Sequence, residues 1–192
     1  QLNLLGGGTT LTYARNDDGI FAGTLGGDGT FAKIGTGTLT LTGGGAHTGL
    51  IAVNQGGVQL DGAFGSTVAV ANGATLSGNG SVVGAASIAD GGILSLDAGR
   101  GPFTAGTLTL SNGSIINAQF GGAGAGALAD VTGNLTLDGT VNVSDTSGLG
   151  VGSYRLFNYG GALTDNVLAL GSLPGNIIRG NVVIQTAIAG QV

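Results

Sequence analysis

The residues able to do acid–base or metal chemistry are few and of one kind. All ten acidic residues are Asp, Glu and Cys are absent, and His47 is the one histidine in the 192 residues. Five Asp residues directly precede a glycine, which is typical of tight turns; they are Asp18, Asp28, Asp61, Asp90 and Asp138. No two carboxylates have the i, i+2 spacing that places side chains on one strand face, where a paired acid–base site would often lie. His47 lacks a second His or Cys with which to hold a metal ion. We therefore predict no catalytic, metal-binding or cofactor-binding residue and no enzyme activity.

The composition indicates many short strands joined by tight turns. The chain has 43 Gly but also 42% hydrophobic residues and only 8% charged residues, whereas disordered chains combine low hydrophobicity with high charge. Glycine reaches the backbone conformations that tight turns require. Five basic residues and a net charge of −5 leave no basic patch for nucleic acid. Residues 1–20 lack the pattern of a signal peptide, and we interpret the chain as a fragment of a longer protein.

A short alternating strand recurs along the chain. Its clearest copies carry the pattern Gly-Thr-Leu-Thr-Leu or a variant of it; they are 37–41, 57–60, 73–76, 92–96, 106–110 and 133–137. Each copy points its apolar residues to one face of a strand. We take Leu39, Val58, Leu76, Leu94 and Leu108 as equivalent positions, evenly spaced except for a shorter last interval. A longer interval follows before Leu135, so one rung there is long or the register differs.

This repeat predicts an all-β fold, a right-handed parallel β-helix (β-solenoid) with rungs of about 18–20 residues. Strand spacing then predicts about nine or ten rungs in a rod roughly 45 Å long. Stacking buries the apolar face of every rung in one continuous core. The predicted inward residues are Leu39, Leu41, Leu60, Val68, Val70, Leu76, Leu94, Leu96, Leu108, Leu110, Leu135, Leu137, Val141 and Val143.

Residues 24–60 resemble the autotransporter-associated β-strand repeat. The match comprises a glycine-rich turn, Lys33, the strand 37–41 and the strand 53–60, which reads Val-Asn-Gln-Gly-Gly-Val-Gln-Leu. The loop between these strands departs from the family pattern, because His47 stands where tyrosine is usual. Later blocks at 72–80, 130–143 and 152–161 are similar to the C-terminal part of autotransporter passengers.

The resemblance implies a passenger domain of type V secretion. Such a passenger is exported through the outer membrane by its own C-terminal translocator β-barrel, a partner that this sequence lacks, and is displayed at the bacterial cell surface. In that family the last rungs act as an autochaperone, which folds first and templates the rungs above it. On this basis we divide the chain into rungs at 1–100, with the repeat at 24–60, and an autochaperone-like cap at 101–192.

Aromatic residues concentrate in the second of these parts. Five of the nine aromatics follow residue 100, and a core richer in aromatics buries more area per residue. We expect the C-terminal end to be the more stable one. The candidate residues of the cap are Phe103, Phe120, Tyr154, Leu156, Phe157 and Tyr159.

Two other functions remain open at the level of sequence. Outward Thr, Asn and Gln ladders would suit an adhesin that binds a host surface molecule or mediates bacterial self-association. Parallel β-helices also include glycan-degrading enzymes, but these use clustered carboxylates, and the Asp residues here follow the turn pattern. We therefore favour a structural stalk and folding segment.

Overall fold

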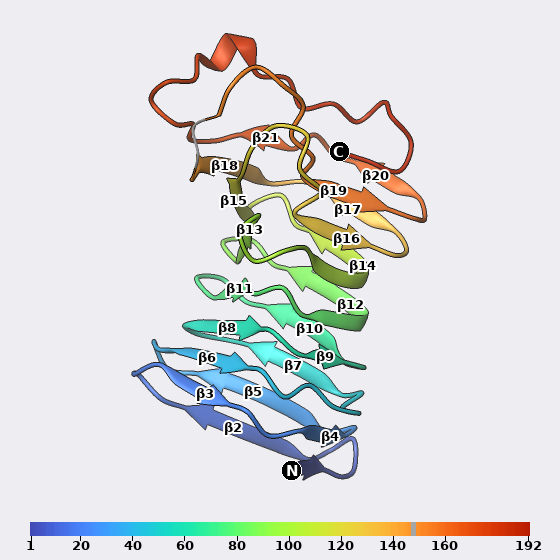
Figure 1. Ribbon diagram of the computed structural model, residues 1–192. Helices are drawn as coiled ribbons and strands as arrows, with labels where there is room; N and C mark the ends of the chain where they lie inside the picture. Colours follow the sequence, from blue (N-terminus) through green and yellow to red (C-terminus); the bar gives the residue numbers. More distant parts are fainter. Residues whose placement is uncertain (147–148) are drawn as a thin grey trace.

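The computed structural model describes residues 1–146 and 149–192 as a parallel β-solenoid of about seven turns (Figure 1). The chain passes repeatedly through three strand positions, which build three faces along the rod. Every pairing between named strands is parallel and joins one rung to the next. The all-β solenoid predicted from the repeat is confirmed.

Each face collects one short strand from successive rungs. Face 1 contains β1 (Leu2–Leu4), β4 (Leu25–Gly27), β9 (Ala63–Phe64), the first parts of β12 (Ser81–Ile88) and β14 (Phe103–Leu110), β16 (Ala129–Val131) and β19 (Phe157–Tyr159). Face 2 contains β2 (Thr10–Ala14), β5 (Thr30–Ile34), β7 (Leu50–Val53), β10 (Thr67–Val70), the second parts of β12 and β14, β17 (Leu135–Leu137) and β20 (Leu163–Asp165). Face 3 is an eight-stranded sheet of β3 (Gly19–Phe21), β6 (Thr38–Leu41), β8 (Gly57–Leu60), β11 (Thr75–Ser77), β13 (Ile93–Asp97), β15 (Ile115–Phe120), β18 (Thr140–Asp145) and β21 (Ala169–Leu170). A short 3-10 helix, η1, spans Arg179–Asn181.

The core follows from the alternation within these strands. Leu39, Val58, Leu76 and Leu94 stack on successive strands of face 3, and each is buried. Inward side chains from the three faces form one apolar cluster that runs the length of the rod. Of the fourteen predicted inward residues, thirteen are buried, while Val143 is partly buried and packs against that cluster.

Two details of the predicted register are wrong. Leu108 does not continue the column of Leu94, because Leu94 pairs with Ile116 on face 3 and Leu108 pairs with Leu135 on face 2. The long interval between Leu108 and Leu135 is therefore a single long rung. Face 3 stacks eight strands rather than nine or ten, which corresponds to about 34 Å at the usual strand spacing.

Rungs lengthen toward the C-terminus. On face 3 the interval between stacked positions increases at each step beyond Leu94, first to Ile116, then to Val141 and then to Leu170. The added residues lie in the connections from face 3 to face 1, which grow from 78–80 to 98–102, 121–128 and 146–156. The predicted rung of about 18–20 residues, a length typical of a β-solenoid repeat, therefore holds only for the N-terminal half.

Candidate functional site at the C-terminal end

Two of the predicted cap residues form a column in the core of face 1. Phe103 of β14 pairs with Ala129 of β16, which in turn pairs with Phe157 of β19. Both phenylalanines are fully buried. The small Ala129 occupies the layer between the two rings, so three rungs contribute to one column.

The other predicted cap residues lie around the same end of the rod. The Phe120 and Tyr154 rings meet edge to face, with centroids 5.6 Å apart. The Tyr154 hydroxyl donates to the Gly150 carbonyl and accepts from the Gly150 N–H, which holds the connection in place. Leu156, which directly precedes Phe157 in the sequence, is buried. Tyr159 is half-buried and pairs with Val131 of β16.

The C-terminal residues cover the edge of the last rung, a feature that the sequence did not predict. The Val192 N–H donates to the Phe157 carbonyl at 2.9 Å, and the Tyr159 N–H donates to the Gly190 carbonyl at 2.9 Å. Asn158 and Gln191 form an antiparallel bridge, in contrast to the parallel pairing of the solenoid. On face 3, the Arg179 guanidinium donates to the Leu170 and Gly171 carbonyls. Edge groups that would otherwise be unpaired therefore have partners.

The N-terminal end has a different construction. Within the described residues, β1, β2 and β3 are each paired to the following rung alone. Leu5 and Ile20 are exposed there, at 74% and 75%. One end of the rod is thus covered by its own chain, whereas the other presents open strand edges.

Two ionisable side chains are unexpectedly buried in the N-terminal rungs. Lys33 occupies an inward position of β5, stacked between Tyr13 and Val53. Its Nζ donates to the carbonyls of Ile34 at 2.9 Å, Gly35 at 2.7 Å and Gln55 at 3.3 Å, which uses all three ammonium protons. Burial lowers the pKa of Lys33, and the Asp18 carboxylate opposes this shift.

His47 joins three consecutive rungs. Its Nε2 lies 2.9 Å from the Gly29 carbonyl oxygen and its Nδ1 lies 2.7 Å from Ser66 Oγ. Because a carbonyl only accepts, Nε2 is the donor, and in the neutral ring the single Ser66 hydroxyl proton is shared between Nδ1 and the His47 carbonyl oxygen, which lies 3.0 Å from Ser66 Oγ. Burial lowers the pKa of His47, against the opposing effects of the Gly29 carbonyl and the Asp28 carboxylate.

This lowered pKa predicts a loss of stability in mild acid. The folded chain binds a proton at His47 less readily than the unfolded chain, so the stability from this group is complete above the ordinary value of 6.5 and falls as the pH drops below it. For one proton the free energy of unfolding changes by at most about 1.4 kcal/mol per pH unit. Urea unfolding between about pH 7.5 and 5.5 measures this change in a range where exposed carboxylates stay ionised. His47→Gln should flatten the dependence, and equal slopes in both proteins would contradict the assignment.

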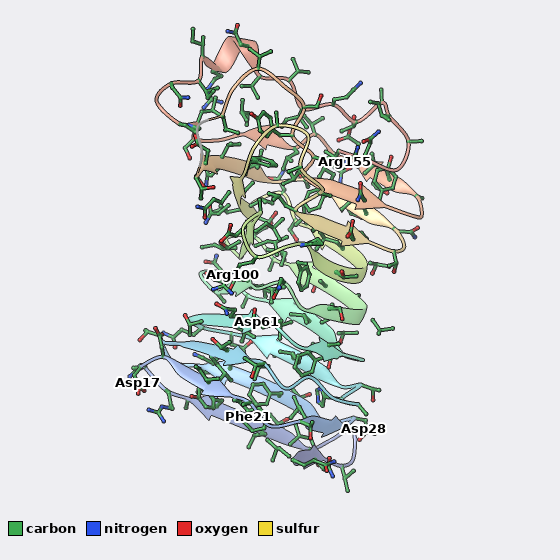
Figure 2. All side chains as sticks on the ribbon, viewed as in Figure 1. Asp17, Phe21, Asp28, Asp61, Arg100 and Arg155 are labelled. Atoms are coloured by element: carbon green, nitrogen blue, oxygen red, sulfur yellow. The ribbon has the colours of Figure 1, made fainter. Side chains whose placement is uncertain are left out.

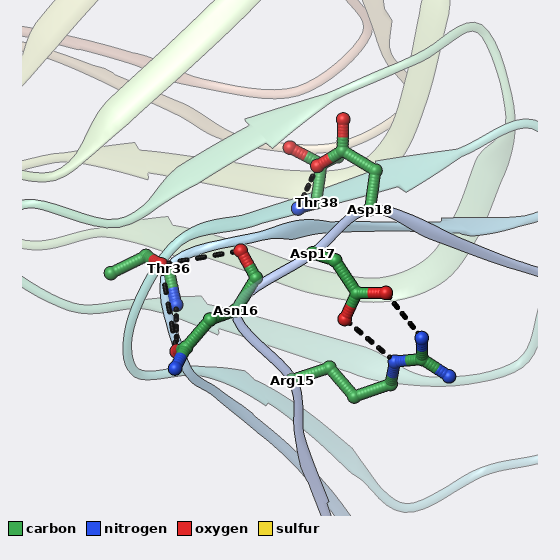
Figure 3. Close-up of polar contacts among 6 residues, drawn as sticks. All are labelled: Arg15, Asn16, Asp17, Asp18, Thr36 and Thr38. Atoms are coloured by element: carbon green, nitrogen blue, oxygen red, sulfur yellow. Dashed lines mark hydrogen bonds and ion pairs between the residues drawn. The ribbon is translucent and has the colours of Figure 1, made fainter.

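Several Asp and Asn side chains of the turns join one rung to the next. Asn16 Oδ1 accepts from the Thr36 N–H at 3.1 Å, and Asp18 Oδ1 accepts from the Thr38 N–H at 2.7 Å (Figure 3). Asp28 and Asp90 accept backbone N–H groups of Gly6 and Gly113 in the same way. Such side-chain contacts replace the pairing that a turn interrupts.

The remaining charges lie mostly at the surface. The Arg15–Asp17 pair beside Asn16 is exposed (Figure 3), where solvent screening leaves an ion pair little net stabilisation. Arg100 Nη1 lies 3.7 Å from Asp61 Oδ1 on the side of the rod (Figure 2). Within residues 1–146 and 149–192, no group of three or more His, Cys, Asp or Glu side chains is placed to hold a metal ion.

Comparison with known proteins finds similarity to an autotransporter. The Adhesin BmaC autotransporter of Brucella suis biovar 1 (strain 1330) is 50% identical to the chain over an alignment of 113 residues, and the match covers 55% of this chain and 3% of that protein. The chain fits an autotransporter passenger fragment. This agrees with the resemblance of residues 24–60 and of the later blocks. No protein-family model matches the chain, and none of the helices among its described residues is long and apolar enough to cross a membrane.

Proposed function

We propose that this fragment is the structural stalk and folding segment of a secreted bacterial autotransporter passenger. In this proposal residues 1–100 extend the rod, and residues 101–192 act as an autochaperone that folds first. The parent's own C-terminal translocator barrel exports the chain. The similarity to an autotransporter implies secretion through the outer membrane to the cell surface.

The covered C-terminal end of the rod carries the proposal. A solenoid is stabilised by contacts between neighbouring rungs, so an end rung without a neighbour is its weakest part. At the C-terminal end, residues 190–192 and Arg179 supply the missing partners of β19 and β21. At the other end, the edges of β1, β2 and β3 are open to a further rung. Folding that starts at the covered end always adds the next rung to a formed edge.

Deletion of residues 103–192 from the full-length parent tests this direction. We expect the barrel to insert into the outer membrane and the passenger to be missing from the cell surface, because the rungs proposed to fold first have been removed. A matched deletion of residues 19–57 removes two N-terminal rungs in register, since Gly19, Leu39 and Val58 occupy one position. That deletion should preserve display. Normal display after deletion of 103–192 would overturn the proposal.

Adhesion is a second candidate function, favoured by the outer surface of face 3. Polar, uncharged side chains follow one another there on successive strands; they are Thr40, Gln59, Ser77, Ser95, Asn117 and Asn142. The Asn142 side-chain amide donates to Asn117 Oδ1 at 3.1 Å, so part of the column is ordered by its own contacts. The relative is named an adhesin. A regular polar column suits a host surface molecule or a neighbouring passenger.

Asn117→Lys in the displayed parent tests adhesion separately from folding. Asn117 is exposed and lies between Ser95 and Asn142 in the column, so the charge should reduce cell binding without reducing surface display. Thr109→Lys, at an exposed position of β14 on face 2, is the matched control. Equal binding by the two variants would exclude face 3 as the adhesive surface.

A further inference from the structure

A large cavity lies where the solenoid core meets the C-terminal segment. Its volume is about 1130 Å³, and it is lined by Val141 and Val143 of β18, Leu170 of β21 and residues between Leu173 and Val192. The long connections 121–128 and 146–156 contribute Ala125, Tyr154 and other residues to it. The cavity is therefore a product of the same added residues that lengthen the last rungs.

The lining is apolar over most of its extent. Aliphatic side chains from β18, β21 and the segment 173–192 are joined by Phe120 and Tyr154. Each water molecule inside the cavity would need about two to four polar partners, which an apolar wall does not supply. Ligand sites are typically hollows of about 300–1,000 Å³ with this chemistry. The space is large enough for an apolar ligand.

The border of the cavity exposes further apolar side chains. Ile178 is 70% exposed and Val183 is 83% exposed, and both belong to the lining, as do the exposed Val151 and Ile188. Exposed apolar side chains gathered around one hollow mark a binding site more often than an isolated residue does. A ligand that fills the cavity would also cover this border.

One positive charge accompanies the apolar surface. Arg155 lines the cavity and is exposed, in the C-terminal part of the rod (Figure 2). Among the described residues its guanidinium has no hydrogen bond or ion pair, and no acidic side chain lines the cavity. The guanidinium is a strong donor to carboxylate or phosphate oxygens.

We propose that this cavity binds an amphipathic anion with a single long acyl chain. The acyl chain occupies the apolar space, and the carboxylate or phosphate head lies against the Arg155 guanidinium. This ligand site is independent of the stalk function proposed above. A free fatty acid and a lysophospholipid share the required chemistry.

Displacement of the fluorescent fatty acid cis-parinarate from the 192-residue chain tests the site. We expect saturable parinarate binding that dodecanoate reverses and that dodecanol, which lacks the charge, reverses far less well. Lysophosphatidylglycerol in a parallel titration distinguishes a lipid headgroup from a free carboxylate. Arg155→Gln should weaken dodecanoate binding about tenfold, and Val143→Phe should weaken binding by narrowing the space.

Val83→Phe is the control for Val143→Phe, because Val83 is 77% exposed on β12, outside the cavity. It should bind parinarate as the unaltered chain does, and circular dichroism shows whether each variant is folded. Absence of saturable binding, or equal displacement by dodecanol and dodecanoate, would overturn the proposal. A fatty-acid-free dimer that Ile178→Lys converts to a monomer would instead assign the apolar surface to a second copy of the chain.

Discussion

Replacing Gly106 by alanine should destabilise the middle of the rod by at least about 3 kcal/mol, the upper part of the range for overpacking. A Cβ atom at Gly106 would lie 1.9 Å from the Val83 carbonyl oxygen and 2.9 Å from the Gly84 oxygen. Both are backbone atoms of the neighbouring rung, so neither can move away by a change of rotamer. Gly106 has no positive φ, and the expected effect therefore measures the approach of two rungs rather than strain at one residue.

A β-bulge makes this contact so close. Val82 pairs with Ala105 and Ala85 with Thr107, so Val83 and Gly84 of β12 stand opposite the single residue Gly106 of β14. Glycine is the residue expected where a bulge brings two backbones together.

Gly122→Ala is the matched control, since a Cβ there meets nothing within 4 Å. Thermal and urea unfolding followed by circular dichroism should separate the two variants clearly. Equal midpoints for Gly106→Ala and Gly122→Ala would show that the rungs can move apart at the bulge at little cost.

Alternation in the sequence was sufficient to predict the strands and most of the core. Leu39, Val58, Leu76 and Leu94 were placed in one column because every second residue of a strand faces the same way. Alternation does not say which face of the solenoid a strand occupies. The pattern Thr-Leu-Thr-Leu lies on face 3 at 38–41 and on face 2 at 107–110, which is why Leu108 was assigned to the wrong column.

The features of the site that could not be predicted depend on contacts between distant rungs. Lys33 would be expected at the surface from its type, yet the turn at Gly35 and the next rung at Gln55 present carbonyls that its ammonium group satisfies. The pairing of residues 190–192 with β19 has no signal in the local pattern. The aromatic count did point to the part of the chain where Phe103 and Phe157 occupy one column on either side of Ala129, although the order of folding stays a prediction.

Phe157→Ala should produce the second large effect and report on that order of folding. Removing the fully buried ring of Phe157 from the last rung should destabilise it by about 3–5 kcal/mol. If the C-terminal rungs form first, the loss of the ring already destabilises the folding transition state, and refolding slows by about 100-fold or more. Rapid dilution from urea measures the rate, and Tyr13→Phe in both proteins lets tyrosine fluorescence report the C-terminal end through Tyr154 and Tyr159.

Phe21→Ala provides the comparison at the opposite end. Phe21 belongs to β3 in the first rung of face 3, is half-buried and packs against the core cluster. Its loss should accelerate unfolding and proteolysis of the N-terminal rungs while leaving the refolding rate nearly unchanged, because its contacts form after the transition state. The reverse result, in which Phe21→Ala slows refolding and Phe157→Ala does not, would place the folding nucleus at the N-terminal end. The aromatic column would then stabilise the finished rod without starting its assembly.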